Sequence, residues 1–452
     1  MSDFLADLIT GQFLVSALVL GIGAHVVLVM AGLCVYFERK VSAYIQDRLG
    51  PNRTGLDLGL PFLKFLKGMA GLGQGAADGL KFFLKEDYTP ANVDRVLFTL
   101  APVFAVVPAL LGFVILPWGG YWSMPEMTLP LVGWTIGGEN VSVAGAEVSI
   151  GIVYLLAVAS VGVYGVTLGG WASNNKYSML GGLRCTAQMI SYEIPMGIAL
   201  LCVLLIAGSF VPNDIIAHQR EHGWMVLSMP APAILFYICT LAEANRAPFD
   251  NAEAEQELVG GFHTEYSSMR FALYPLAEYS HFFVGSAFFV LLFLGGYDLP
   301  FVGLTSVEAT GVLAVVLKVH VFLIKTLLVV FLSMLVRWTI PRVRYDQVMM
   351  LGWGAMIPAA LLMIVVTSVM VYMGWTSTVE LLLANLVMFA IIFVGRTVLA
   401  SMFGRSVVNH KIPLYGSRFS PVEGFAVSAA PTHPMALEDR PVQGTDPQTQ
   451  PV

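Results

Sequence analysis

Carboxylates gather in one stretch of the chain, residues 241–279, which lies between long apolar segments. The acids are Glu243, Asp250, Glu253, Glu255, Glu257, Glu265 and Glu278. Only Arg246 and Arg270 accompany them, so negative charge stands unbalanced beside the apolar segments. Ionisable groups at membrane depth are costly, and they usually move protons or ions or contact a polar ligand. A solvated loop is the alternative, but Glu243 and Glu278 lie inside the ends of the flanking apolar segments.

Helical spacing would bring some of these groups together. Asp250, Glu253 and Glu257 recur at i, i+3 and i+7, so on a helix they would share one face. Glu243 and Arg246 are three residues apart, a distance at which a carboxylate and a guanidinium on one helix can pair. The sequence therefore predicts an acidic helical face and one local ion pair.

Further ionisable residues stand at the edges of apolar segments. Glu193 comes two residues before Pro195, about one turn into an apolar segment, where the proline removes a backbone hydrogen bond and can admit water. Glu38 and Arg39 stand at the mouth of the first apolar segment. We expect all three charged groups to be functional, because buried charge without a role is rare in membranes.

Three arginines surround Pro341 at the end of another apolar segment: Arg337, Arg342 and Arg344. They could anchor a membrane helix at the interface, or they could form a docking surface for a soluble partner. Lysines among Leu and Phe at helical spacing, such as Lys64, Lys67 and Lys81, instead favour helices that lie in the membrane interface.

The composition defines the elements that must position these residues. Of 452 residues, 57% are hydrophobic and 12% are charged, against about 25% charged in soluble domains. The fold class is therefore an all-α polytopic membrane protein, with residues 1–402 as a transmembrane helical domain and 403–452 as a disordered tail rich in proline. Nine spans of about 20 residues are expected near 13–36, 96–117, 149–169, 188–208, 229–243, 276–297, 311–336, 349–373 and 379–401.

Several functional classes are disfavoured. The net charge is −6 and no basic stretch is interleaved with aromatic residues, so a nucleic-acid partner is not expected. The four cysteines stand singly, which indicates neither a disulfide framework nor an iron–sulphur site. No two histidines share a span at ligand spacing, and no metal or haem site is predicted. The outer connection 118–148 alternates polar and apolar residues and could form a small hairpin.

Lysine and arginine counts indicate the orientation. The connections after the first, third, fifth, seventh and ninth spans carry nine, two, two, three and four of these residues. The connections on the other side carry one, Arg220. Because basic connections stay inside, the N-terminus is expected outside and the acidic stretch and C-terminal tail in the cytoplasm.

Five motifs, in the same order, closely resemble the quinone-docking membrane subunit of respiratory complex I, which is the H subunit of bacterial NADH–quinone oxidoreductase. The resemblance covers about residues 12–372. Asn251 and Ala252 depart from it, because the family usually has Leu-Pro there. The motifs are ERKVSAYIQDRLGPNRTG, ADGLKFFLKED, GWASNNKYSMLGGLR with AQMISYE, AEANRAPFD with EAEQELVGGFHTEYSSMRFAL, and RWTIPRVRYDQ.

The resemblance implies a subunit of the bacterial plasma membrane that receives quinone as its substrate and holds no cofactor. NADH, flavin and iron–sulphur clusters would belong to partner subunits, namely other membrane subunits and the peripheral subunits of the quinone site. With Asp250, a proton path would comprise Glu193, Glu243, Glu253, Glu255, Glu257, Glu278 and Asp78. The quinone chamber would involve Glu38, Arg39, Arg337 and Arg342.

Two other classes agree less well with the sequence. The corresponding subunit of membrane-bound hydrogenases is similar but binds no quinone, and the intact ERK and RWTIPRVRYDQ motifs favour the quinone enzyme. A free-standing secondary transporter would show internal repeats with interrupted spans in matching positions. No such duplication is found in this chain.

The orientation is testable with a reporter. We expect a fluorescent or enzymatic reporter fused after Val452 to be active on the cytoplasmic side, because nine spans return the chain to the side of its basic connections. A periplasm-specific reporter at the same position serves as the control. Reporter activity in the periplasm would show that the chain has one span fewer than predicted or that its orientation is the opposite one.

Overall fold

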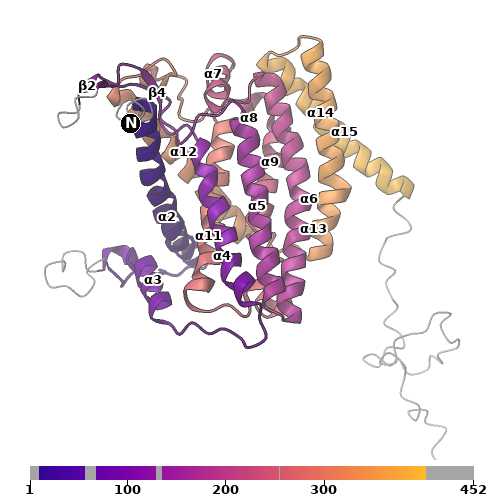
Figure 1. Cartoon of the computed structure of the whole chain (residues 1–452). Coiled ribbons are helices and arrows are strands. Elements are labelled where there is room, and N and C mark those ends of the chain that lie inside the picture. Colours follow the sequence, from indigo (N-terminus) through magenta and orange to yellow (C-terminus); the bar gives the residue numbers. More distant parts are fainter. Residues whose placement is uncertain (1–9, 56–67, 129–134, 254, 404–452) are drawn as a thin grey trace, which may run out of the picture. The chain divides into compact units, whose positions relative to one another are not determined.

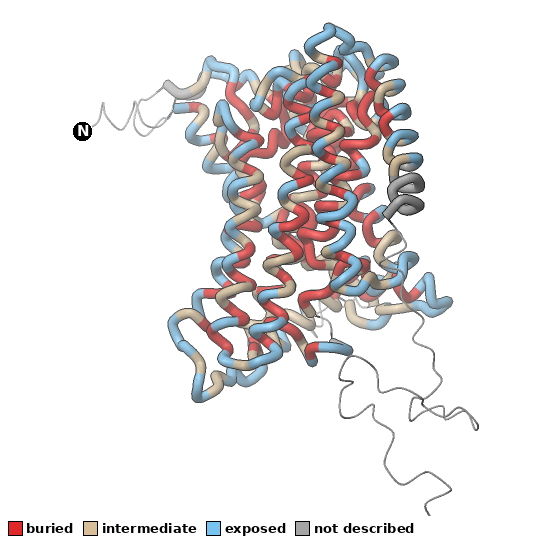
Figure 2. Tube along the Cα trace, turned by 90° about the vertical axis from the view of Figure 1, so that its right-hand side faces the viewer, coloured by how far each residue is buried: buried red, intermediate tan, exposed pale blue. Residues whose placement is uncertain are grey.

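A computed structural model describes residues 10–55, 68–128, 135–253 and 255–403. The chain divides into two compact units, Met1–Phe389 and Ala390–Val452, and the description below concerns the first. Long helices make up this unit (Figure 1). Buried positions run along the sides of the helices that face one another, and exposed positions lie outside (Figure 2). The predicted tail lies outside the described residues after Phe403.

The predicted all-α membrane fold is confirmed. Seven described helices are long and apolar enough to cross a membrane, and two shorter apolar helices, Pro230–Glu243 and Thr378–Ile392, correspond to the fifth and ninth predicted spans. The long helices are α2 (Gly11–Ile45), α4 (Arg95–Leu111, prolonged by η3, Gly112–Ile115), α5 (Gly151–Ala172), α6 (Lys176–Ala207), α11 (Ser268–Phe293), α12 (Val312–Thr339), and α13 (Tyr345–Leu351) continued by η6 (Gly352–Met356) and α14 (Ile357–Tyr372). The shorter ones are α9 (Pro230–Glu243) and the first part of α15 (Thr378–Phe403).

The connection after the first span contains helices, and the connection 118–148 contains paired strands, as expected. The outer hairpin is confirmed: β1 (Tyr121–Ser123) pairs antiparallel with β4 (Asn140–Ser142), and β2 (Met127–Thr128) with β3 (Thr135–Ile136). At the opposite end of the bundle, η2 (Met69–Gly71) and α3 (Gln74–Leu84) follow α2 (Figure 1). No side chain of α3 is buried, as expected of a helix at an interface. Lys64 and Lys67 lie outside the described residues.

The fourth predicted span is wrong at its start. Helix α6 begins at Lys176, where the side chain of Asn175 accepts a hydrogen bond from the Tyr177 amide as an N-cap. Glu193 is therefore in mid-helix rather than in the first turn, and Pro195 lies inside α6 without ending it. The glycine-rich first half of α6 is not apolar enough to be recognised as a span, yet it packs closely against α5.

The acidic helical face predicted for residues 250–257 is also wrong. Asp250 lies in irregular backbone and Glu253 in a turn, and α10 contains only Glu255–Leu258. The reason is the buried amide of Gln188, whose Nε2 donates to the carbonyls of Ala242 and Phe249, both at 2.8 Å. Since these carbonyls are satisfied by a side chain, the segment need not be helical to lie inside the bundle.

Asn251 completes this arrangement, at a position where the family usually has an apolar residue. Its Nδ2 donates to the Gln188 Oε1 at 3.2 Å, and both side chains are buried. The amide of Gln188 is thus used as donor and as acceptor, and the loop after α9 (Pro230–Glu243) is tied to α6. Two short helices, α7 (Pro212–His222) and α8 (Met225–Ser228), precede α9.

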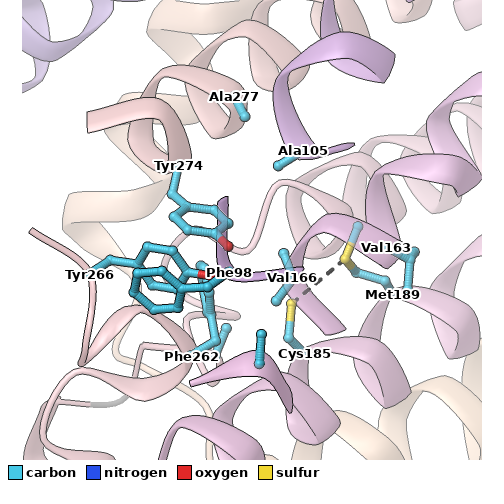
Figure 3. Packing of buried hydrophobic residues seen from close by; sticks show 12 residues of the cluster. Phe98, Ala105, Val163, Val166, Cys185, Met189, Phe262, Tyr266, Tyr274 and Ala277 are labelled. Carbon is cyan, nitrogen blue, oxygen red and sulfur yellow. Dashed lines mark hydrogen bonds between the residues drawn. The ribbon is translucent and has the colours of Figure 1, made fainter. Parts of the chain in front are cut away.

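An aromatic cluster holds the same loop against the bundle (Figure 3). Phe98 of α4 stacks on Tyr266 with ring centroids 4.0 Å apart, and Phe262, in the 3-10 turn η4 (Gly261–His263), meets the edge of Tyr274 at 5.0 Å. Rings of this size each bury a large apolar area and prefer such stacked or edge contacts. The cluster therefore joins α4 and α11 to the loop that carries the acids.

Gln188→Leu should destabilise the loop, because it removes the side-chain hydrogen bonds to the Ala242 and Phe249 carbonyls and leaves the buried Asn251 amide without its acceptor, at a cost of about 1–3 kcal/mol for an unsatisfied group. All four cysteines are buried, so labelling of this chain by a thiol-reactive dye during heating reports its unfolding. We expect labelling to begin at a lower temperature in Gln188→Leu. Gln46→Leu, at an exposed glutamine, is the control. Equal onset in both variants would contradict the role of the Gln188 amide.

Candidate functional site

The predicted charged residues of α2 and α12 meet in a buried ion pair. Glu38 Oε1 pairs with Arg337 Nη1, and both side chains are less than one-fifth exposed. The Tyr279 hydroxyl of α11 donates to the other carboxylate oxygen, Oε2, at 2.5 Å. A buried carboxylate needs such a cation and donor, since desolvation of an unpaired charge costs several kcal/mol. Glu38 therefore joins three helices at one point.

A second ion pair lies beside the first. Arg246 Nη2 stands 2.7 Å from Glu278 Oε2, with both side chains nearly buried. The Arg246 guanidinium also lies over the Tyr279 ring, at 4.2 Å from its centroid, so Tyr279 connects the two pairs. The predicted pair between Glu243 and Arg246 is wrong. Helix α9 ends at Glu243, and Arg246 lies beyond it in irregular backbone, where helical spacing no longer applies.

Asp250 and Glu253 extend this charged region into the loop. Burial raises the pKa of Asp250 to about 6, and the nearby Glu253 contributes to the rise, while Arg342 and Arg246 oppose it. Asp250 Oδ1 and Arg342 Nη2 are buried and form no hydrogen bond with any residue that the structure describes. Buried polar atoms are almost always hydrogen-bonded. These two atoms can therefore form hydrogen bonds with water or a polar ligand.

Glu243 forms a third contact, with His281 of α11, at 3.3 Å between Oε1 and Nε2. Both residues line two neighbouring cavities between the helices. One has a volume of about 40 Å³ and is also lined by Glu278, Asn245 and Met189. The other has a volume of about 30 Å³ and is lined by apolar residues together with Thr240. Glu243 and His281 thus stand where two cavities meet.

Glu193 lies near the same place, on the side of α5 and α6. The Ser160 hydroxyl of α5 donates to Glu193 Oε1. Ala159, the residue before Ser160, lines both cavities. Glu193 also lies within electrostatic reach of Glu243. The tertiary structure therefore groups Glu193 with acids that are far from it in the sequence.

Other predicted site residues lie apart from this region. Arg39 pairs with Asp78 of α3 at 2.7 Å, and the Arg39 side chain is 46% exposed. Glu257 pairs with Arg184 at 2.6 Å at the surface. The side chain of Glu255 is outside the described set. The structure thus separates two peripheral ion pairs from the buried acids.

Two residues of the site were not recognised from the sequence. His281 is a lone histidine in its span, and the sequence shows no local partner for it. Its position three residues after Glu278, on the same helical face, is the signal that could have indicated it. Tyr279 has an ordinary aromatic setting in the sequence, and only its contacts with Glu38 and Arg246 give it a place in the site.

The fold and the site together define a multi-pass membrane protein that buries a run of paired ionisable groups between its helices. A family model described as NADH dehydrogenase matches residues 17–368, and the chain belongs to that family. The resemblance found in the sequence motifs is thereby confirmed. Helix α15 lies beyond the matched residues.

Similar bacterial proteins support the same assignment, and each is named as an H subunit of NADH-quinone oxidoreductase. The one from Cytophaga hutchinsonii is 43% identical over 340 residues, which cover 75% of this chain and 92% of that protein. The one from Flavobacterium psychrophilum is 41% identical over 349 residues, covering 76% and 92%. The one from Geobacter sulfurreducens is 42% identical over 347 residues, covering 76% and 91%.

The pKa of Asp250 can be tested by infrared spectroscopy of the assembled protein. We expect a protonated-carboxyl band that titrates with a midpoint near pH 6 and is absent from Asp250→Asn. Arg342→Ala removes a positive charge that favours the ionised form, so it should raise this midpoint by about 1 pH unit or more. Arg344→Ala, at an exposed arginine, should leave it unchanged. A downward movement in Arg342→Ala would contradict this assignment of charges.

Proposed function

We propose that the chain is the quinone-docking membrane subunit of a proton-translocating NADH–quinone oxidoreductase of the bacterial plasma membrane. It forms part of the quinone chamber and couples quinone reduction to proton translocation through its buried carboxylates. The observation that carries this proposal is the run of paired groups from Glu38 to Glu278, which continues to Glu243 and His281 between two cavities. The names of the similar proteins support the reaction.

The redox centres belong to other subunits in this proposal. Quinone is the substrate received here, whereas NADH, flavin and iron–sulphur clusters are held by partner subunits of the complex. Membrane partners and the peripheral subunits of the quinone site complete the chamber. The N-terminus lies outside and the C-terminus in the cytoplasm, in agreement with the basic connections.

The chamber end of the path is where Glu38, Arg337 and Arg342 gather near Asp250, with Arg39 and Asp78 at its periphery. Arg342 Nη2 is buried and lacks an acceptor among the described residues. A quinone oxygen would satisfy this donor, and a charged donor forms the stronger kind of hydrogen bond. Arg337 is already paired with Glu38, so it serves to hold the carboxylate in place.

Coupling follows from electrostatics. Glu278 feels the charges of Arg246, Glu253, Asp250 and Arg337, so a change of charge at the loop alters the free energy of protonating Glu278. Two unit charges 4 Å apart interact by about 4 kcal/mol at an effective dielectric constant of 20. One pKa unit corresponds to about 1.4 kcal/mol. The electrostatic energy that accompanies proton uptake or release at the chamber is therefore large enough to change the protonation of the next acid.

The path then continues across the cavities. Glu278 and Glu243 line the first cavity, and Glu243 with His281 lines the second. The linings are largely apolar, but water held at their carboxylates and imidazole would bridge side chains that do not touch. Glu243 is the step shared by both cavities, and Glu193 is the acid that follows it.

Glu243→Gln tests this function in the purified, assembled enzyme. Glutamine keeps the shape and hydrogen bonding but cannot carry charge, so we expect quinone-dependent turnover and proton pumping in proteoliposomes to fall together. Glu243→Asp should be milder, because it keeps an ionisable group with one methylene less reach. Oxidation of NADH by an artificial acceptor should stay normal, since it needs only the partner subunits.

A control within the same acidic stretch is Glu265→Gln. Glu265 accepts a hydrogen bond from Asn175 at 2.5 Å, which glutamine can also accept, and it lines neither cavity. Its turnover and pumping should match the unmodified enzyme. Full turnover with full pumping in Glu243→Gln would show that the proton path runs elsewhere.

A further inference from the structure

Two histidines of helix α7 share one of its faces, at the end of the bundle opposite α3 (Figure 1). His218 and His222 are four residues apart, and their rings are stacked with centroids 4.4 Å apart. The spacing of four residues on a helix is the one by which two imidazoles bind a single transition-metal ion. Imidazole lone pairs lie in the ring planes, so the two rings would turn out of this stack to share an ion. Neither residue contributes to the carboxylate path described above.

The tautomer of His222 suits a metal ligand. Its Nδ1 lies 3.2 Å from the His218 carbonyl oxygen. A carbonyl oxygen only accepts, so Nδ1 carries the proton and Nε2 presents its lone pair. Metal-binding histidines usually donate their second N–H to a carbonyl or carboxylate in this way, which orients the ring.

His218 supplies a second imidazole. Its Nδ1 is buried and forms no hydrogen bond with any residue in the described part of the chain. Because Nδ1 is enclosed by protein, Nε2 is the nitrogen of His218 that would coordinate an ion.

The surrounding charges favour a cation. Asp214 and Glu221 are exposed on the same side of α7 as His218, since they lie four residues before it and three residues after it. Arg220 does not compete, because its guanidinium pairs with Asp298 at 2.6 Å on the other side of the helix. His222 is exposed and His218 is half-buried, and both lie near negative charge.

We propose that His218 and His222 bind an exchangeable divalent transition-metal ion of the zinc and copper class. Imidazole suits these ions, whereas Mg²⁺ and Ca²⁺ prefer oxygen ligands. No group of three or more histidine, cysteine or acidic residues that could hold a metal occurs among the described residues, so water completes the coordination. The site is thus a surface site that exchanges its ion, distinct from a closed structural site with four protein ligands.

Binding of an ion at this site would make the contacts of α7 with α15 and α11 more rigid. The Thr378 hydroxyl of α15 donates to the His222 carbonyl at 2.6 Å. Gln219 Nε2 donates to the Leu291 carbonyl in the last turn of α11 at 3.0 Å. An ion that bridges His218 and His222 would clamp the last turn of α7, which holds the starting turn of α15 and the end of α11.

Histidine footprinting on the purified complex tests the site residue by residue. Diethyl pyrocarbonate modifies free imidazole nitrogens, and mass spectrometry of the peptide that contains residues 218 and 222 gives the rate at each histidine. Zn²⁺ at ten times its dissociation constant leaves about one site in eleven free, so modification of His222 should slow about tenfold. Mg²⁺ at the same concentration should give no protection.

The variants decide whether the pair is required. In His218→Asn, Zn²⁺ should no longer slow the modification of His222. His320→Asn is the matched control: His320 also lies against the carbonyl four residues before it, at 2.7 Å, but no histidine stands four residues away from it. It should keep the full protection of His222. Absence of protection by Zn²⁺, or equal protection with and without His218, would overturn the proposal.

Discussion

The cost of burying charge among apolar helices is the constraint on which the rest of this structure depends. A single ionised group far from water would cost many kcal/mol, so three acids inside the bundle lie beside a cation, a hydroxyl or an imidazole. Glu38 has Arg337 and Tyr279, Glu278 has Arg246, and Glu243 has His281. Each partner comes from another helix or loop, so the same contacts that satisfy the charges also define how the elements pack.

Irregular backbone inside the bundle follows from the same constraint. Helix α9 has 14 residues, about 21 Å of helix, and is too short for a hydrocarbon core of about 30 Å. The chain beyond it turns back among the helices without regular structure, which is tolerated where side chains satisfy the backbone. Gln188 does this for two carbonyls, and the aromatic cluster around Phe262 covers the loop. Asp250 can therefore stand close to Arg246 and Arg342.

Helix α11 connects the buried acids to the end of the bundle where α7 lies. It carries Glu278, Tyr279 and His281 near its middle, and its C-terminal end is held by side chains from α7 and α12. The Lys325 ammonium of α12 donates to the carbonyls of Leu294 and Asp298, at 2.6 and 2.5 Å, just after the helix. A cation at this position satisfies free carbonyls and complements the helix dipole. Movement of the acids is thus tied to both ends of one helix.

The sequence by itself determined the membrane fold, the positions of most spans, the outer hairpin and the set of acids, because these follow from composition, periodicity and charge within a short window. Its motifs also indicated the family. The tertiary structure decided which groups meet: Arg246 with Glu278 instead of Glu243, Glu193 with Ser160, and His281 with Glu243. It also decided that residues 250–253 lie in irregular backbone and turns and that α6 begins at Lys176. Such choices depend on packing between segments distant in the chain, where a partner such as Gln188 or Tyr279 leaves no local pattern.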